Sequence, residues 1–212
     1  MSMDMPLQTN TPQNGSNLGQ IEIRIARGFD DTMVAFAIRS AVFLAEQSCP
    51  YNEEFDGNDT TATHVIGYID DEPAATMRIR YFGKFAKLER MAVRREYRSG
   101  PIGTKLVEYT INFARRKGFT AVYGHAQEGR ERYWQFSMRH FGKANPLPDV
   151  PNFEFSGHSY TAMGMEIPAS PDELQMNSDP NLLNRPEGEW DRPGILEKSI
   201  GKLPEQTRKI RQ

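Results

Sequence analysis

The stretch "LERMAVRREYRSGPIGTKLVEYTINFARRKG", residues 88–118, decides the fold because it joins a strand, a glycine-bearing turn and a long helix. The strand is predicted to end at Val93. From Ile102 the apolar residues recur at helical spacing, and Gly118 stands where a helix C-cap belongs. The amides at such a helix start have no partner within the helix and can bind an anion. Two glycines in a turn also occur for steric reasons alone, so both interpretations stay open at this point.

Pro101 stands inside the turn, where another residue would offer one more backbone N–H. Proline is nevertheless favoured at the first helical position, where its missing N–H would have had no partner in the helix. We expect Gly100 to be the N-cap and Pro101 the first helical residue, which leaves the amides of Ile102, Gly103 and Thr104 free. The turn is then predicted to bind phosphate with one donor fewer, a loss of about 1 kcal/mol.

Further strands and helices are predicted on both sides of this unit. A helix is expected over residues 31–47, capped by Asp30 or Asp31, and another within residues 129–142. Strands are expected at 21–26, 64–70, 73–82, 86–93, 120–126 and 153–167, the last as one bent strand or a hairpin. Three consecutive strands before the main helix predict an α/β (α+β) fold, a mixed central sheet flanked by helices in a single domain.

The two ends of the chain differ in composition from the centre. Residues 1–19 are polar and lack apolar periodicity, which predicts a disordered leader. The domain is expected over residues 20–167. Residues 168–212 form a C-terminal extension with too many apolar side chains for a free tail, Trp190 among them. We expect the extension to pack on the domain or on a partner subunit, which leaves a homodimer open.

Composition and charge exclude several classes of protein. The 212 residues include one cysteine, Cys49, so neither a disulfide framework nor a thiolate metal cluster is expected. No segment has the run of about 18 apolar residues that a membrane span needs, so a cytoplasmic protein without a membrane partner is predicted. The net charge of −2 does not favour nucleic-acid binding. Residues 41–77 contain no Lys or Arg, whereas residues 76–118 are strongly basic.

Two segments together resemble the GNAT superfamily of N-acetyltransferases. Residues 88–118 are similar to its coenzyme A motif, in which a strand ending in Ala-Val leads to Arg/Gln-x-x-Gly-x-Gly/Ala and a long helix. Arg98 matches the first motif position, Gly103 the last, and Pro101 replaces the middle glycine. Residues 41–70 resemble a small bacterial branch with the pattern VF-x-x-EQ-x-CPY…DG-x-D…H. The resemblance covers roughly residues 21–167 and implies the GNAT fold.

The resemblance implies an N-acetyltransferase that moves an acyl group, expected to be acetyl, from acyl-coenzyme A to a primary amine by direct attack. Acetyl-coenzyme A would be the co-substrate, and no metal is implied. The coenzyme A arm would lie along the strand, and its pyrophosphate would bind at the turn. The implied cofactor-binding residues are Met91, Ala92, Val93, Arg98, Ser99, Gly100, Ile102, Gly103 and Thr104.

Glu89 is the candidate general base, because the resemblance places a carboxylate on this strand beside the thioester. A base is needed since an amine is protonated at neutral pH and must lose a proton before it attacks. The alternative interpretation is a surface glutamate paired with Arg90 or Lys87.

The candidate general acid is Tyr133. Similar proteins protonate the departing thiolate with a tyrosine in an F-Y-x-x-x-G-F pattern, from which this chain departs. Depending on the alignment, Met138 or Trp134 stands at the tyrosine position, and neither is a useful proton donor. Tyr133 is the nearest phenol; its alternative role is that of a core aromatic. His125 and His140 are weaker candidates.

The acceptor is expected to be a small-molecule or peptide amine. An acidic loop follows the first helix and could attract a cationic amine, or it could simply be solvated. Its acidic residues are Glu46, Glu53, Glu54, Asp56 and Asp59.

Two other functions remain open. One is an acyl-homoserine-lactone or N-acyl-amino-acid synthase that takes its acyl group from acyl-carrier protein. The other is a non-catalytic acetyl-coenzyme A sensor, which Pro101 and the missing tyrosine favour.

Overall fold

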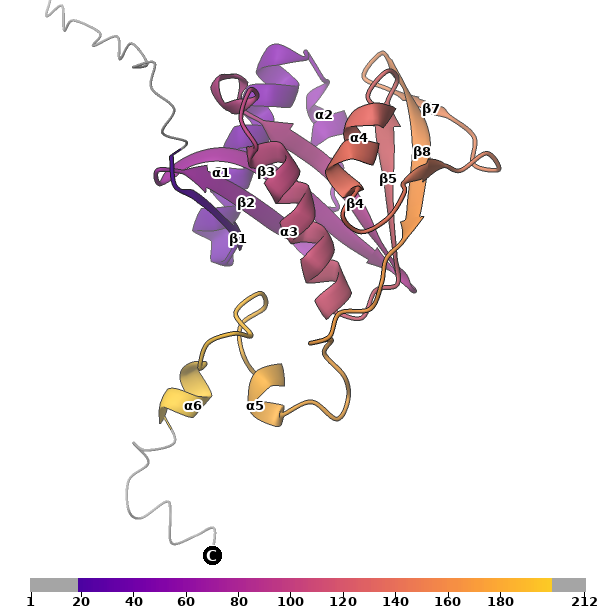
Figure 1. Cartoon of the computed structure of the whole chain (residues 1–212). Coiled ribbons are helices and arrows are strands. Elements are labelled where there is room, and N and C mark those ends of the chain that lie inside the picture. Colours follow the sequence, from indigo (N-terminus) through magenta and orange to yellow (C-terminus); the bar gives the residue numbers. More distant parts are fainter. Residues whose placement is uncertain (1–18, 200–212) are drawn as a thin grey trace, which may run out of the picture.

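A computed structural model describes residues 19–199 of the chain. Within this range one mixed sheet has the order β1-β2-β3-β4-β5-β8-β6, with β7 paired to β8 (Figure 1). The mixed α+β sheet expected from the sequence is therefore confirmed. The strands are β1 (Ile21–Ile25), β2 (Thr63–Ile69), β3 (Glu72–Phe82), β4 (Phe85–Val93), β5 (Ala121–Gln127), β6 (Asn145–Pro146), β7 (Phe153–Phe155) and β8 (His158–Glu166).

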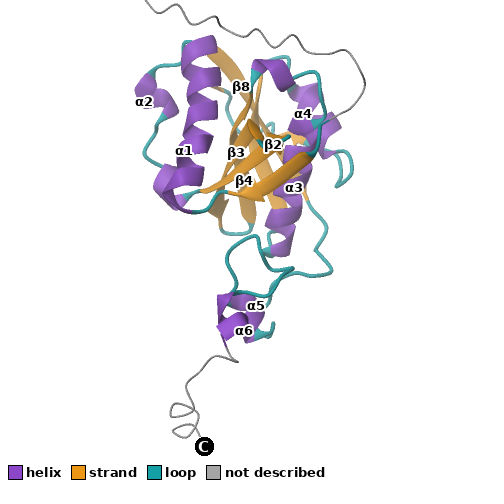
Figure 2. Ribbon diagram, turned by 90° about the vertical axis from the view of Figure 1, so that its left-hand side faces the viewer, coloured by secondary structure: helices purple, strands orange, loops and turns teal. Residues whose placement is uncertain are grey.

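Helices cover both faces of the sheet. Figure 2 shows α1 and α2 on one side of the strands and α3 and α4 on the other. The described helices are α1 (Gly28–Arg39), the π-helix η1 (Ser40–Glu46), α2 (Tyr51–Glu54), the 3₁₀ turns η2 (Asp59–Thr61) and η3 (Arg95–Tyr97), α3 (Ile102–Arg116), α4 (Glu131–Met138), α5 (Pro180–Leu183) and α6 (Ile195–Ser199). In residues 19–199 no helix combines the length and the apolar character needed to cross a bilayer.

The long helix α3 and the hairpin before it follow the sequence prediction closely. Leu106 and Ile111 are fully buried against the sheet, and Gly118 has a φ of +85° just beyond the helix. The β2–β3 hairpin turns at Asp70 and Asp71, both of which have positive φ. Asp tolerates this conformation better than most residues, so the turn is compatible with its sequence.

The first helix begins earlier than expected. It starts at Gly28, not at Asp31, so the prediction that Asp30 or Asp31 caps it is wrong. The Asp31 carboxylate accepts the Arg27 N–H at 2.8 Å from inside the helix, which stabilises the turn that precedes it. The helix then continues as the π-helix η1, a form that often occurs at functional sites.

The strands β4 and β5 pair in parallel over only part of their length. Pairing joins Phe85–Leu88 to Ala121–Gly124 and then stops. The β3–β4 register shifts just beyond this point, and Arg90 has a φ of +53°, which marks a bulge in β4. Because the bulge bends β4 away from β5, the two strands separate toward their carboxyl ends and leave an opening in the sheet.

The described part of the extension packs against the carboxyl end of α3. The Trp190 ring stacks on Phe113 with 5.4 Å between centroids and is 6% exposed. Leu174 donates its N–H to the Arg116 carbonyl at 2.8 Å, and Arg116 pairs with Asp191 at 2.6 Å. Residues 168–199 thus contact the domain of their own chain. Most of the predicted leader, residues 1–18, and the end of the extension, residues 200–212, lie outside the described residues.

Candidate active site

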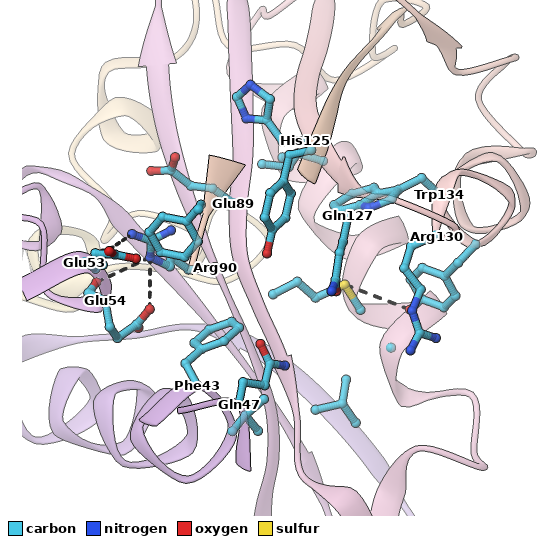
Figure 3. A pocket seen from close by; sticks show the side chains of 18 of the residues that line it. Phe43, Gln47, Glu53, Glu54, Glu89, Arg90, His125, Gln127, Arg130 and Trp134 are labelled. Carbon is cyan, nitrogen blue, oxygen red and sulfur yellow. Dashed lines mark hydrogen bonds and ion pairs between the residues drawn. The ribbon is translucent and has the colours of Figure 1, made fainter. Parts of the chain in front are cut away.

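A cleft of about 780 Å³ lies where β4 and β5 separate. In Figure 3, Glu53, Glu54 and Arg90 lie on one side of it and Arg130 and Trp134 on the other. Eight of the residues predicted for the site line this cleft, namely Glu89, Met91, Val93, Arg98, Gly100, Gly103, Thr104 and Tyr133.

The other predicted residues lie near the cleft without lining it. The side chain of Ile102 is buried in the core beneath α3, and that of Ala92 packs with α1 on the opposite face of the sheet. Only their backbone atoms could serve the site. Ser99 is exposed in the turn before α3.

The turn at the start of α3 differs by one residue from the prediction. Pro101 is the N-cap, not the first helical residue, and its carbonyl accepts the Lys105 N–H at 3.0 Å. Proline fits this position because its backbone already has helical angles, with φ −81° and ψ −1°. The amides of Ile102, Gly103 and Thr104 occupy the first three helical positions and lack intrahelical partners. The turn therefore fits a pyrophosphate group despite the proline.

Arg98 is held by its own chain rather than pointing freely into the cleft. Its Nη2 contacts Glu46 Oε2 at 2.6 Å, and its Nε donates to the Val93 carbonyl at 2.9 Å. These contacts join the π-helix η1 to the end of β4, so Arg98 fixes the shape of the turn. Arg130, which no motif in the sequence indicates, lines the same cleft and adds a further cation to it.

Gly103 brings α3 close to Tyr133. A Cβ atom at position 103 would lie 2.6 Å from Tyr133 Oη and 3.1 Å from Met91 Cε, so a larger residue would displace the tyrosine hydroxyl. Burial raises the pKa of Tyr133, which keeps the hydroxyl protonated at neutral pH. Trp134, at the alternative motif position, is 8% exposed. Tyr133 is thus a phenol that can donate a proton inside the cleft.

Glu89 follows directly after the paired part of β4. Its Oε1 accepts from Arg78 Nε at 2.9 Å, and its Oε2 pairs with Lys87 Nζ at 2.8 Å. The predicted partner Lys87 is present, whereas the predicted alternative Arg90 pairs with Glu54 and Asp56 instead. The cations fix the orientation of the Glu89 carboxylate. Arg78 Nη2 also contacts Oε1 at 2.9 Å, whereas Oε2 pairs with Lys87 and retains a lone pair that can accept a proton.

A buried arginine network joins Glu89 to the acidic loop. The guanidinium groups of Arg39 and Arg78 are completely buried. Arg78 Nη1 contacts both Asp56 and Asp59 at 2.8 Å, and Arg39 Nη1 contacts Asp59 at 2.6 Å. The members of the network are Arg39, Arg78, Arg90, Glu54, Asp56, Asp59 and Glu89.

The network changes the interpretation of the acidic loop. Glu54, Asp56 and Asp59 are ion-paired inside the protein, so they are not free to attract a cationic amine. Burial acts to raise the pKa of Asp56, but the hydrogen bonds from Arg78 and Asn58 and the charge of Arg78 together outweigh it and hold that pKa well below its usual range. The pKa of Asp59 is lowered in the same way, against burial, by Arg39 and Arg78. Glu46 is likewise paired, with Arg98.

The arginine network is difficult to predict from the sequence for a physical reason. Arg39, Arg78 and the loop are far apart in the sequence, and only the folded sheet brings them together. A signal did exist, because Arg39 stands in a helix and Arg78 in a strand at positions where the pattern predicts buried residues.

Known proteins resemble this chain in sequence over the part that forms the cleft. A sequence model of the "Acetyltransferase (GNAT) family" matches residues 32–142, the part of the chain that contains the arginine network, the turn and Tyr133. A Bacillus subtilis protein that carries the name of an acetyltransferase is 36% identical over 100 residues, which are 46% of this chain and 68% of that protein.

Solved structures share the fold. The crystal structure of Escherichia coli ElaA aligns with a TM-score of 0.58 and 23% identity over 68% of this chain and 99% of that chain. The acyl-homoserine-lactone synthase LasI aligns with a TM-score of 0.55 and 12% identity over 70% of this chain and 90% of its own. At these identities the likeness concerns the fold alone. The match to the family model over more than half of the sequence shows that the chain belongs to the GNAT family of acetyltransferases.

Proposed function

We propose that this protein transfers an acetyl group from acetyl-coenzyme A to a primary amine. The observation that carries the proposal is the continuous cleft from the first turn of α3, past Tyr133 and Met91, to Glu89. It brings an anion site, a phenol and a carboxylate into one opening of the sheet. Acetyl-coenzyme A supplies the activated acyl group as its thioester.

The chain's own groups divide into binding and proton-transfer groups. The amides of Ile102, Gly103 and Thr104 bind the pyrophosphate, supported by Arg130 at the cleft wall. The exposed backbone edge of β4 beyond the bulge, at Met91 to Val93, is unpaired with β5 and can hydrogen-bond to the extended arm of coenzyme A. A backbone N–H on this edge also stabilises the oxyanion that forms during the transfer.

Two side chains move protons. Glu89 takes the proton that the attacking nitrogen loses, directly or through a water, while the nitrogen–carbon bond forms and the carbon–sulfur bond breaks. Tyr133 gives its hydroxyl proton to the departing sulfur. Proton exchange with solvent then returns Glu89 to its carboxylate form and Tyr133 to its phenol form, so the enzyme is unchanged after each turnover.

The proposal is tested by following thiol release from acetyl-coenzyme A in the presence of a panel of primary amines, with decanoyl-acyl-carrier protein as a second donor. We expect amine-dependent release of coenzyme A and formation of the acetylated amine, detected by mass spectrometry. Transfer only from the acyl-carrier protein would contradict the proposal. So would binding of acetyl-coenzyme A without transfer to any amine.

A further inference from the structure

Four flat rings form one wall of the cleft on the side of Glu89. We call this the aromatic wall; it consists of His125 on β5, Phe153 and Phe155 on β7, and Tyr160 on β8, all of which line the cleft. Phe153 stacks on Tyr160 with 5.4 Å between centroids and 14° between planes. His125 meets Phe153 edge-on at 4.5 Å. The rings therefore hold one another in fixed orientations.

The aromatic wall faces the point where the acceptor must react. Lys87 is paired in register with Tyr123, and two residues further along the two strands stand Glu89 and His125. These two residues are thus the first pair beyond the place where β4 and β5 separate. An amine that loses its proton to Glu89 consequently has the aromatic wall within a few carbon atoms of its nitrogen.

Most of the charged groups around the wall are paired within the protein. Glu53 accepts the Ser156 N–H at 3.0 Å, and Glu54 and Asp56 are paired within the arginine network. Burial, assisted by the nearby Lys87 ammonium, lowers the pKa of His125 to about 4, so the imidazole is neutral at pH 7. Apart from the Glu53 carboxylate, which within residues 19–199 is hydrogen-bonded but not ion-paired, the wall thus presents an uncharged surface to the acceptor.

One ring of the wall remains open to a ligand. Phe153 is 40% exposed although it stacks on Tyr160 and touches His125. Phe155, in contrast, is covered by the Arg90 guanidinium at 4.8 Å from its ring centroid. Aromatic rings prefer stacked or edge-on contacts with other rings, which a saturated ring of similar size cannot reproduce.

We propose that the aromatic wall binds an aromatic ring of the acceptor, so that the substrate class is a primary amine with an aromatic ring a few carbons from its nitrogen. This inference rests on the proposed function, because it names the acceptor of that transfer. It replaces the acidic loop with an uncharged aromatic surface as the part of the cleft that selects the acceptor.

The test compares two amines of equal chain length, 2-phenylethylamine and 2-cyclohexylethylamine, by calorimetric titration into the full chain. We expect the wild-type protein to bind the phenyl compound about fivefold more tightly, the typical gain from one good aromatic contact. Phe153→Leu removes the ring and should abolish the preference. Phe82→Leu is the matched control, because Phe82 is similarly exposed, at 37%, but lies outside the cleft.

Equal affinity for the two amines, no detectable binding of either, or a preference that survives Phe153→Leu would each overturn the inference. Transfer assays with the same two amines separate it from the proposed function. If acetyl transfer proceeds equally with both amines, the proposed acetyltransferase function is supported and the aromatic acceptor is contradicted. If the phenyl compound binds with the expected preference but no amine is acetylated from acetyl-coenzyme A, the aromatic wall is supported as a ring-binding surface and the proposed reaction is contradicted.

Discussion

At the scale of single residues, the hydroxyl of Tyr133 is the group whose role is most directly testable. It lies against Gly103 and Met91 inside the cleft, and burial raises its pKa, so it is a proton donor across the neutral range. We expect Tyr133→Phe to lower kcat about 100-fold, as loss of a general acid does, with little change in the KM for acetyl-coenzyme A. Steady-state kinetics measures both constants.

Tyr97→Phe is the matched control for this prediction, because Tyr97 also lines the cleft but lies at the turn before α3. Its kcat should stay within about twofold of the wild-type value. An unchanged kcat in Tyr133→Phe would show that another group, or water, protonates the sulfur.

Arg78 is the residue on which the stability of the arginine network depends. It is completely buried and contacts Asp56, Asp59 and Glu89. Arg78→Met removes the one cation within residues 19–199 that contacts all three of these carboxylates at the buried centre of the network, and we expect a loss of about 3–5 kcal/mol in the free energy of unfolding. Urea unfolding measures the loss. Arg80→Met, on the same strand but partly exposed, should cost less than about 1 kcal/mol.

The same network predicts how stability depends on pH. The pKa values of Asp56 and Asp59 are lower in the folded protein than in the unfolded chain, where they are about 3.9. Near pH 3–4 the folded protein therefore binds fewer protons at these two carboxylates than the unfolded chain does. Their stabilising contribution is present at neutral pH and is lost as the pH falls below that value. Unfolding at a series of pH values should show a steeper decline below pH 4 for the wild-type protein than for Arg78→Met. Parallel curves would contradict this assignment.

Single residues also show where sequence reasoning stops. Glu89, Gly103 and Tyr133 could be assigned to one site because the GNAT resemblance implies a carboxylate, a coenzyme A turn and a tyrosine at or near these positions, and all three line the cleft. The pairing of Arg39 with Glu54 and Asp59 could not, because it depends on how the acidic loop folds back over the sheet. The sequence therefore leaves two roles open for the acidic loop, attraction of a cationic amine or simple solvation, whereas most of its charge is neutralised by ion pairs in the folded protein.

At the scale of elements, the start of α3 determines how coenzyme A is held. Pro101 as N-cap removes one N–H from the turn. We expect Pro101→Ala, which restores this donor, to bind coenzyme A about fivefold more tightly, equivalent to roughly 1 kcal/mol. Calorimetric titration measures the change. Pro101→Gly restores the same donor but adds backbone freedom, so its gain should be smaller. Weaker binding by both variants would mean that the rigid backbone of Pro101 contributes more to coenzyme A affinity than the restored N–H does.

Elements with strong periodicity were predictable, and those shaped by tertiary contacts were not. Helix α3 and the β2–β3 hairpin follow from apolar spacing and turn residues alone. The bulge at Arg90 has no local sequence signal, yet it opens the sheet between β4 and β5 and so creates the cleft. The start of α1 at Gly28 also depends on a contact, the reach of Asp31 back to Arg27.

At the scale of the whole molecule, the extension stabilises the domain without lining the cleft. Trp190 is buried against Phe113 on α3, while none of the residues that line the cleft comes from 168–199. We expect Trp190→Ala to lower the free energy of unfolding by about 3–5 kcal/mol and to leave acetyl-coenzyme A affinity unchanged. Met176→Ala, at a fully exposed position in the same extension, should change neither. Weaker binding in a folded Trp190→Ala protein would show that the extension shapes the site.

The central claim is that the cleft between β4 and β5 binds acetyl-coenzyme A through the first turn of α3. Calorimetric titration of acetyl-coenzyme A into the wild-type protein, Gly103→Glu and Asn112→Glu tests it most directly. Asn112 is exposed further along the same helix, so it controls for the added charge, and circular dichroism confirms that each variant is folded. We predict micromolar binding to the wild-type protein and to Asn112→Glu, and none to Gly103→Glu. Equal binding to all three, or no binding to the wild-type protein, would contradict the claim.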